Sequence, residues 1–215
     1  MDTIIETTIA FVKQALVGAE AGHDWFHIER VYRTSLLINK NERGDELVIA
    51  LAALLHDIAD PKFNNGDEEI GPRKAEEFLR LNNVDEKITE HVKRIIGNMS
   101  FKNSFDNGGF TSLEMKIVQD ADRLDAIGAI GIARAFTYGG FKNRTLYDPA
   151  IKPVNEHTKE SYKNTTAPTI NHFYEKLLLL KNKMNTETGK KLADDRHDFM
   201  LTFLDQFYKE WEGKQ

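Results

Sequence analysis

A stretch of eleven residues limits the folds that this chain can adopt. Residues 45–55 read DELVIALAALL, which as a helix is apolar on nearly every face, and a helix of that kind has to be buried on all sides. His56 and Asp57 follow at once. Because an unpartnered buried carboxylate is costly, this pair requires a hydrogen-bond network, an ion pair or a metal ion.

The rest of the chain also has helical patterning. Apolar residues recur three and four positions apart, and the alternation typical of strands is nowhere sustained. We therefore predict an all-α fold. The expected helical segments, besides the buried one from 45 to about 59, are 2–16, 27–41, 66–83, 84–100, 111–136, 168–184 and 186–213.

One long segment, residues 137–168, interrupts the helical pattern. It contains Gly139 and Gly140, three prolines and several lysines and arginines. Connections of this length in a compact domain are usually functional or disordered. A basic, flexible lid and a plain disordered excursion are equally compatible with the sequence.

Size and composition exclude several classes of protein. A chain of 215 residues is expected to form a single domain, residues 1–215. Its net charge of −5 gives no general attraction to nucleic-acid polymers or anionic membranes. The absence of cysteine excludes disulfides, thiolate zinc sites and a cysteine nucleophile. We see no signal peptide and no membrane-spanning run, so we expect a cytoplasmic protein without a membrane partner.

Four polar residues within helical segments form a candidate metal-binding set. His27 opens one helix, His56 and Asp57 end the buried helix, and Asp122 lies in a further, mostly apolar helix. Two imidazoles and two carboxylates suit a divalent ion that keeps open positions for water and substrate. Taken singly, each is more often a hydrogen-bonded core residue, and Asp122 has Arg134, or Arg123 of a neighbouring molecule, as an alternative partner.

The order of these residues resembles the HD-domain superfamily of metal-dependent phosphohydrolases. The segments GHDWFHIERV, LLHDIADPKF, MSFK, QDADRLDAIGAIGIARAF and HFYEKLL together are similar to a bacterial subgroup that includes nucleotide pyrophosphohydrolases. The resemblance extends from about residue 20 to 212. It implies a single-domain HD helical bundle in which His27, His56, Asp57 and Asp122 bind one divalent ion.

The identity of that ion does not follow from the ligand set. Nitrogen and oxygen ligands with open positions accept Mn, Mg, Fe, Co, Ni or Zn, and we expect manganese. Dinuclear HD phosphodiesterases often have two extra histidines between the His-Asp pair and the last aspartate, whereas only His91 lies there. One ion is therefore expected, with a second ion on His91 and Asp60 as the alternative.

The resemblance also implies supporting residues. Asp60, one turn after Asp57, is the expected general base for the attacking water, or else a cap of the following loop. His23 is expected to support His27 by hydrogen bonding, and Lys62 to meet phosphate. Further candidates for substrate binding are Arg123, Asp125, His172 and Lys176, the last two being one helical turn apart. Each of these also fits an ordinary polar surface or a salt bridge.

The implied reaction is hydrolysis of a nucleoside triphosphate to monophosphate and pyrophosphate by a metal-activated water. A 5′-nucleotidase, a cyclic-nucleotide phosphodiesterase and a nucleotide-sensing HD domain of low turnover are alternatives that use the same residues. A further alternative is an all-α protein whose polar core groups pair with each other. The aromatic stripe in FLDQFYKEW fits either a core face or a dimer interface, so monomer and homodimer both stay open.

Overall fold

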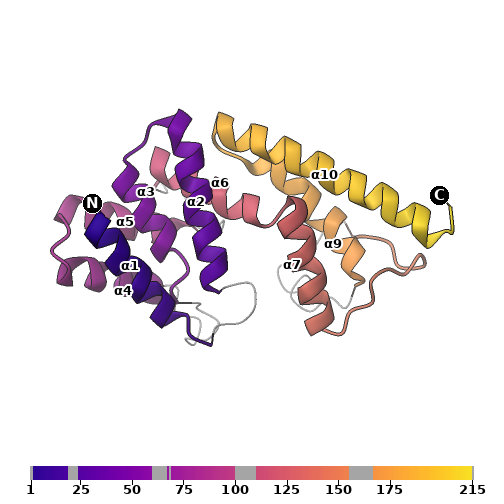
Figure 1. Cartoon of the computed structure of the whole chain (residues 1–215), viewed down its shortest axis with the longest axis horizontal. Helices are drawn as coiled ribbons and strands as arrows, with labels where there is room; N and C mark the ends of the chain where they lie inside the picture. Colours follow the sequence, from indigo (N-terminus) through magenta and orange to yellow (C-terminus); the bar gives the residue numbers. More distant parts are fainter. Residues whose placement is uncertain are drawn as a thin grey trace. The chain divides into compact units, whose positions relative to one another are not determined.

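Every regular element in the described part of the chain is helical. The computed structural model describes residues 2–18, 24–59, 67, 69–99, 110–154 and 167–214. Its helices are α1 (Asp2–Ala15), α2 (Trp25–Glu42), α3 (Glu46–Leu55), α4 (Ile70–Leu81), α5 (Glu86–Asn98), α6 (Leu113–Asp125), α7 (Gly128–Phe141), α9 (Thr169–Glu175), the 3-10 helix η3 (Leu177–Lys183) and α10 (Glu187–Trp211) (Figure 1). The all-α prediction is confirmed. None of the described helices is long and apolar enough to cross a membrane.

The chain divides into two compact units, residues 1–122 and 123–215. In the first unit α3 is the central helix and contacts α1, α2 and α5. Residues Val48–Leu55 of α3 are all buried, as the apolar stretch predicts. The prediction of one domain over residues 1–215 stays a prediction.

Capping residues decide where the helices of the first unit begin. The Asp45 carboxylate accepts hydrogen bonds from the backbone N–H groups of Leu47 (3.0 Å) and Val48 (3.1 Å), which starts α3. Asp24 caps α2 in the same way through the His27 N–H at 3.0 Å. These caps set the register of α2 and α3, and with it the positions of His27 and His56.

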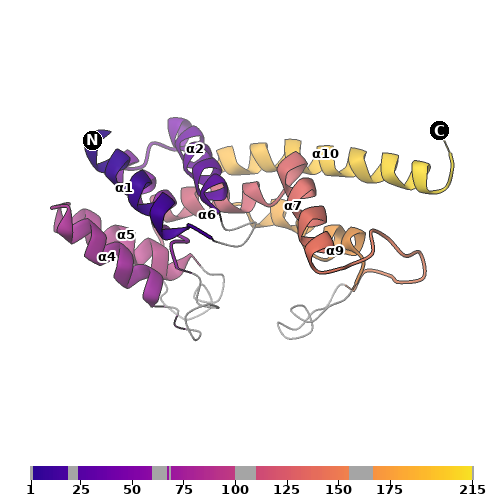
Figure 2. The ribbon, with the colours of Figure 1, turned by 60° about the horizontal axis from the view of Figure 1, so that its bottom comes forward.

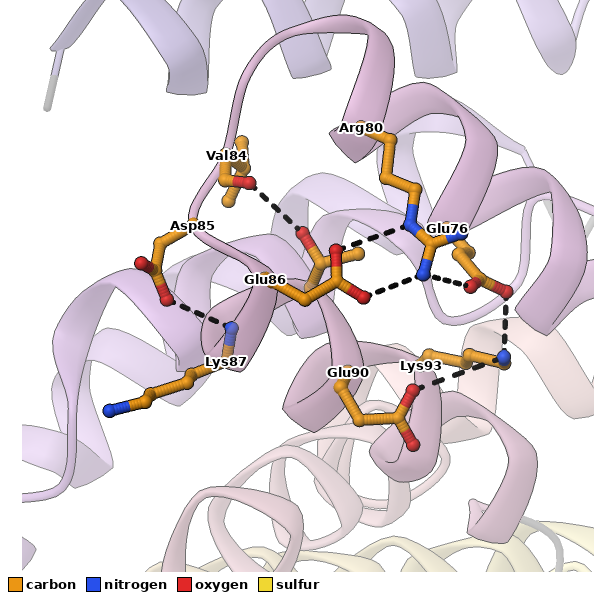
Figure 3. A network of polar contacts seen from close by, with 9 residues as sticks. Glu76, Arg80, Val84, Asp85, Glu86, Lys87, Glu90 and Lys93 are labelled. Atoms are coloured by element: carbon orange, nitrogen blue, oxygen red, sulfur yellow. Dashed lines mark hydrogen bonds and ion pairs between the residues drawn. The ribbon is translucent and has the colours of Figure 1, made fainter.

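Helices α4 and α5 lie side by side in both ribbon views and contact each other (Figure 2). A surface network also joins them: Arg80 pairs with Glu76 at 2.9 Å and with Glu86 at 2.6 Å, and Lys93 pairs with Glu76 at 2.7 Å (Figure 3). The hydrogen bond from Lys93 lowers the pKa of Glu76. Because Arg80 is 54% exposed, water screens these pairs and each contributes little to stability. The network is therefore a small structural contribution beside the apolar contact.

The second unit is formed by α7, α9, η3 and α10, which contact one another. Its aromatic core includes the rings of Phe136, Phe173 and Phe203, with centroids 5.8–6.0 Å apart. The expected helix over 168–184 is interrupted, because α9 ends at Glu175 and the chain continues as the 3-10 helix η3.

The expected helix over residues 111–136 is likewise not continuous. It ends at Asp125 and restarts at Gly128, whose φ of +73° is a left-handed conformation that favours glycine. A Cβ atom at Gly128 would lie 2.9 Å from Cγ of Arg196. The break therefore has two physical causes, the backbone conformation and the α10 side chain that lies against it.

The predicted long connection over residues 137–168 also differs in part from the structure. Residues 137–141 belong to the last turns of α7, so the long connection starts later than expected. Residues 155–166 lie outside the described residues, and a lid role for this segment stays a prediction.

Candidate metal centre

His27 lies in the first turn of α2, where the Asp24 cap fixes the backbone. Its side chain is only 4% exposed, and its Nε2 lies 3.5 Å from Oδ1 of Asp122 on α6. Two segments 95 positions apart in the sequence thus bring an imidazole and a carboxylate together.

His56 follows the last residue of α3 and serves as its C-cap. Its Nδ1 lies 2.9 Å from the carbonyl oxygen of Ala53. A carbonyl oxygen only accepts, so Nδ1 carries the proton and donates it, and in the neutral ring Nε2 keeps its lone pair. That Nε2 lies 4.0 Å from Oδ1 of Asp122, and the His56 ring meets the His27 ring edge-on at 5.5 Å.

Asp57 completes the convergent set. Donor atoms of His27, His56 and Asp57 all lie within 4.8 Å of one another. The candidate ligands differ in solvent exposure. The His27 and His56 side chains are 4% and 6% exposed, whereas the Asp122 side chain is 43% exposed. The imidazoles therefore form the buried side of the cluster, and the Asp122 carboxylate is accessible to solvent.

Two distances between these donors suit a shared divalent metal ion. Nitrogen and oxygen ligands lie about 2.0–2.2 Å from a first-row ion, so two ligands of one ion are at most about 4.4 Å apart. The distances of 3.5 and 4.0 Å from Asp122 fall inside that limit. In metal sites the second nitrogen of a ligating imidazole usually donates to a backbone or side-chain oxygen. The Ala53 carbonyl oxygen accepts such a hydrogen bond from His56 Nδ1 here.

Of the other candidate residues from the sequence, three are not described and four belong to the second unit. Asp60, Lys62 and His23 lie outside the described residues. Arg123 donates from Nη1 to the carbonyl oxygen of Lys183 at 2.6 Å, and Asp125 forms an ion pair with Arg134. His172 and Lys176 are on and just after α9 in the second unit. Substrate binding by all of these residues stays a prediction.

His91 is not part of the convergent set found among the described residues. Its Nε2 lies 3.0 Å from Oγ of Ser112 and 3.5 Å from Oε2 of Glu114. Glu114 also accepts a hydrogen bond from the Asp45 N–H at 3.1 Å, which joins the start of α6 to the start of α3. The contacts of His91 thus support helix packing, and nothing in them favours a second ion.

Sequence reasoning missed three residues that contact the candidate residues or their helices. The Ala53 carbonyl orients His56, and only the three-residue spacing at a helix end hints at it. Arg196 donates from Nη1 to the Leu124 carbonyl oxygen at the end of α6. Arg144 adds positive charge beside His172. For the two arginines the partner is far away in the sequence, so no local pattern reports the contact.

Comparisons with known proteins show what the chain is similar to. Residues 25–127 match the model of the HD domain. The chain is 37% identical over 207 residues to the YpgQ protein of Bacillus subtilis, covering 94% of this chain and 91% of that protein.

Solved structures extend the similarity to the fold. A crystal structure of an HD-superfamily hydrolase from Bacillus thuringiensis is 45% identical, covers 99% of both chains and superposes with a TM-score of 0.81. The crystal structure of Bacillus subtilis YpgQ in complex with ADP is 34% identical, covers 96% of this chain and 94% of that chain, and has a TM-score of 0.76.

Proposed function

Because this chain belongs to the HD-domain superfamily of metal-dependent phosphohydrolases, we propose that it hydrolyses nucleoside triphosphates to monophosphate and pyrophosphate. Two observations support the proposal: donor atoms of His27, His56 and Asp57 lie within 4.8 Å of one another, and Oδ1 of Asp122 lies 3.5 and 4.0 Å from the Nε2 atoms of the two imidazoles. The complex of YpgQ with ADP supports a nucleotide as the ligand.

We assign the ion to His27, His56, Asp57 and Asp122, and we expect a single manganese ion. When bound, a divalent ion lowers the pKa of water and neutralises charge on a phosphoryl oxygen. His56 contributes through its fixed tautomer, since the Ala53 carbonyl holds the proton on Nδ1 and leaves Nε2 for coordination. Asp122 contributes a carboxylate on the solvent-accessible side.

The remaining roles are proposals for the chain's own residues. The Asp60 carboxylate is proposed to take the proton of the attacking water, and Lys62 to bind a phosphate oxygen. Arg123 and Asp125 stay candidates for substrate binding, and in this structure their side chains also contact Lys183 and Arg134.

Product identification tests the proposed reaction. Purified protein with Mn²⁺ would be given nucleoside mono-, di- and triphosphates, each with and without the 2′-hydroxyl. Chromatography would follow the nucleotides, and separate assays would follow phosphate and pyrophosphate. Monophosphate with pyrophosphate from a triphosphate is the expected result. Nucleoside with phosphate from a monophosphate would replace it with a 5′-nucleotidase, and metal binding without turnover would favour cyclic substrates or a sensing role.

The Asp57→Ala variant tests the site itself. Loss of one carboxylate from the set should lower turnover at least about a hundredfold while helical content by circular dichroism is kept. Asp205→Ala is a matched control, because Asp205 lies on the exposed surface of α10 and pairs only with Lys209, at 2.6 Å, in the contacts described. Retained turnover in Asp57→Ala, with Asp205→Ala also active, would contradict the assignment.

A further inference from the structure

The three helices that carry the candidate metal ligands also meet at their other ends. His27 lies in the first turn of α2, His56 follows the last residue of α3, and Asp122 lies in the last turn of α6. The opposite ends are the end of α2, the start of α3 and the start of α6. With a rise of about 1.5 Å per residue, these ends lie about 12–18 Å from the ligands along the helix axes.

The Glu114 carboxylate is central to this second meeting point. Glu114 lies in the first turn of α6, and its side chain is 14% exposed. Its Oε1 accepts the N–H of Asp45, the N-cap of α3, at 3.1 Å. Burial alone would raise the pKa of this carboxyl, but hydrogen bonds from the Asp45 N–H, its own N–H and the Ser112 hydroxyl bring the pKa below its usual range. The group is therefore ionised near neutral pH and only accepts hydrogen bonds.

Asn39 joins the end of α2 to the same point. This buried residue lies in the last turn of α2. Its amide donates to the Gly44 carbonyl oxygen at 3.2 Å and accepts the Gly44 N–H at 2.7 Å. Gly44 directly precedes Asp45, and a Cβ atom there would lie 3.2 Å from Oε1 of Glu114. The end of α2 and the start of α3 are thus both in contact with the first turn of α6.

A histidine of α5 completes the arrangement. Ser112 Oγ accepts the Met115 N–H at 3.1 Å and so caps α6. Nε2 of His91 lies 3.0 Å from the same Oγ and 3.5 Å from Oε2 of Glu114. Because a carboxylate only accepts, the proton of the imidazole lies on Nε2 and is directed at this pair. We refer to these residues as the Glu114 cluster: Asn39, Gly44, Asp45, His91, Ser112 and Glu114.

Directional contacts in the Glu114 cluster limit how the helices can slide along one another. Apolar burial is non-directional, whereas a hydrogen bond weakens steeply when it is misaligned. A shift of α6 along its axis relative to α3 would break the bond from Asp45 to Glu114. The same shift would move Asp122 relative to His56. Metal sites need ligand distances within about 0.2 Å of their usual values, so a small shift would change metal binding.

We propose that Glu114 is a positioning residue of the candidate metal centre: its carboxylate sets the axial register of α6 against α3, and with it the position of Asp122 relative to His56. The inference rests on the metal centre of the proposed function but not on the identity of the substrate. A purely structural role would change the stability of the fold without changing the ligand geometry of the folded protein.

Metal binding to the full-length protein tests the inference without any substrate. Mn²⁺ would be titrated calorimetrically, and Co²⁺ would be added while the visible absorption, which depends on coordination geometry, is recorded. Glu114→Ala should weaken Mn²⁺ binding about tenfold to a hundredfold, the usual effect of losing a residue that orients a ligand, and should alter the cobalt spectrum. Glu114→Gln keeps an oxygen that accepts the Asp45 N–H, so it should bind Mn²⁺ more tightly than Glu114→Ala.

Glu76→Ala is the matched control. The Glu76 side chain is similarly buried, at 17% exposure, and its carboxylate pairs with Lys93 and Arg80 on α5 and α4 (Figure 3). Neither of these helices carries a candidate ligand. This variant should therefore keep the Mn²⁺ affinity and the cobalt spectrum of the wild type.

The possible outcomes separate this inference from the proposed function. Equal Mn²⁺ affinity in wild type and Glu114→Ala, or an equal loss in Glu114→Ala and Glu76→Ala, would overturn the positioning role and leave the metal centre in place. Absence of binding by the wild type would overturn the metal centre and the inference with it. If circular dichroism shows that Glu114→Ala is unfolded, Glu114→Asp replaces it. That variant keeps the charge but has a shorter reach, so it should also weaken binding, and unchanged affinity would refute the role.

Discussion

Single residues in this protein take their chemistry from backbone groups and nearby charges. His56 has a defined tautomer because one carbonyl oxygen lies 2.9 Å from its Nδ1. His172 is held neutral because it is buried beside two cations. The two imidazoles are thus both suited to interact with ligands in their neutral forms, but for different physical reasons: one has a free lone pair by hydrogen bonding, the other a lowered pKa by burial and charge.

Protonation of His172 should make stability depend on pH. Its folded-state pKa of about 4 lies below the unfolded value of 6.5, so the unfolded chain binds more protons between these values. Stability is then complete above about pH 6.5 and is lost as pH falls toward 4, by an amount on the order of 2–3 kcal/mol. Urea unfolding at several pH values, without phosphate, measures it.

The His172→Gln variant provides the comparison for that dependence. In this variant the free energy of unfolding should change much less between pH 4 and 6.5 than in the wild type, since glutamine does not titrate. Lys176→Met should keep part of the pH dependence, because removing one cation raises the pKa of His172 toward its ordinary value. If the free energy of unfolding depends on pH equally in wild type and His172→Gln, other groups cause the loss of stability in acid.

Element boundaries depend on both local and distant residues. The starts of α2, α3 and α5 follow from Asp24, Asp45 and Asp85, each of which accepts hydrogen bonds from the first turn of its own helix. The end of α6 is different, because Gly128 and the α10 residue Arg196 together decide it. The sequence predicted several helix starts to within two residues, with α2 at His27 instead of Trp25, but it placed the start of α4 at residue 66 instead of Ile70 and did not predict the break at Gly128.

Two glycine variants test the explanation of the break between α6 and α7. Gly128→Ala should destabilise the protein by about 1–3 kcal/mol, because alanine is strained at a φ of +73° and its Cβ would meet Arg196. Gly140→Ala, within α7, should be stabilising by about 0.5–1 kcal/mol, because nothing lies within 4 Å of the new Cβ. Chemical denaturation measures both, and similar effects of the two substitutions would contradict this explanation of the break.

At the scale of the whole molecule, the candidate ligands all come from the first compact unit, residues 1–122. They are drawn from α2, the end of α3 and α6; α2 and α3 contact each other, and α6 contributes the buried residues Ile117, Val118 and Ala121. An ion that binds the folded state and not the unfolded chain must stabilise that arrangement.

Manganese should therefore raise the unfolding midpoint, and EDTA should reverse the change. At an ion concentration one hundred times the dissociation constant, the gain is about 2.7 kcal/mol. Thermal melting with and without chelator measures it. Asp57→Ala should show little or no shift with manganese. A wild-type midpoint that does not respond to either addition would favour polar core groups that pair only with each other.

The sequence alone determined the helical class, the buried helix over 45–55 and the order of the candidate ligands, because periodicity, capping and composition are local properties. Tertiary structure decided which donor atoms meet. Nε2 of His27 and of His56 approach one carboxylate of α6 only because three segments pack on a common core. The break at Gly128 and the position of Arg144 beside His172 also depend on packing between elements, so no spacing within the chain encodes them.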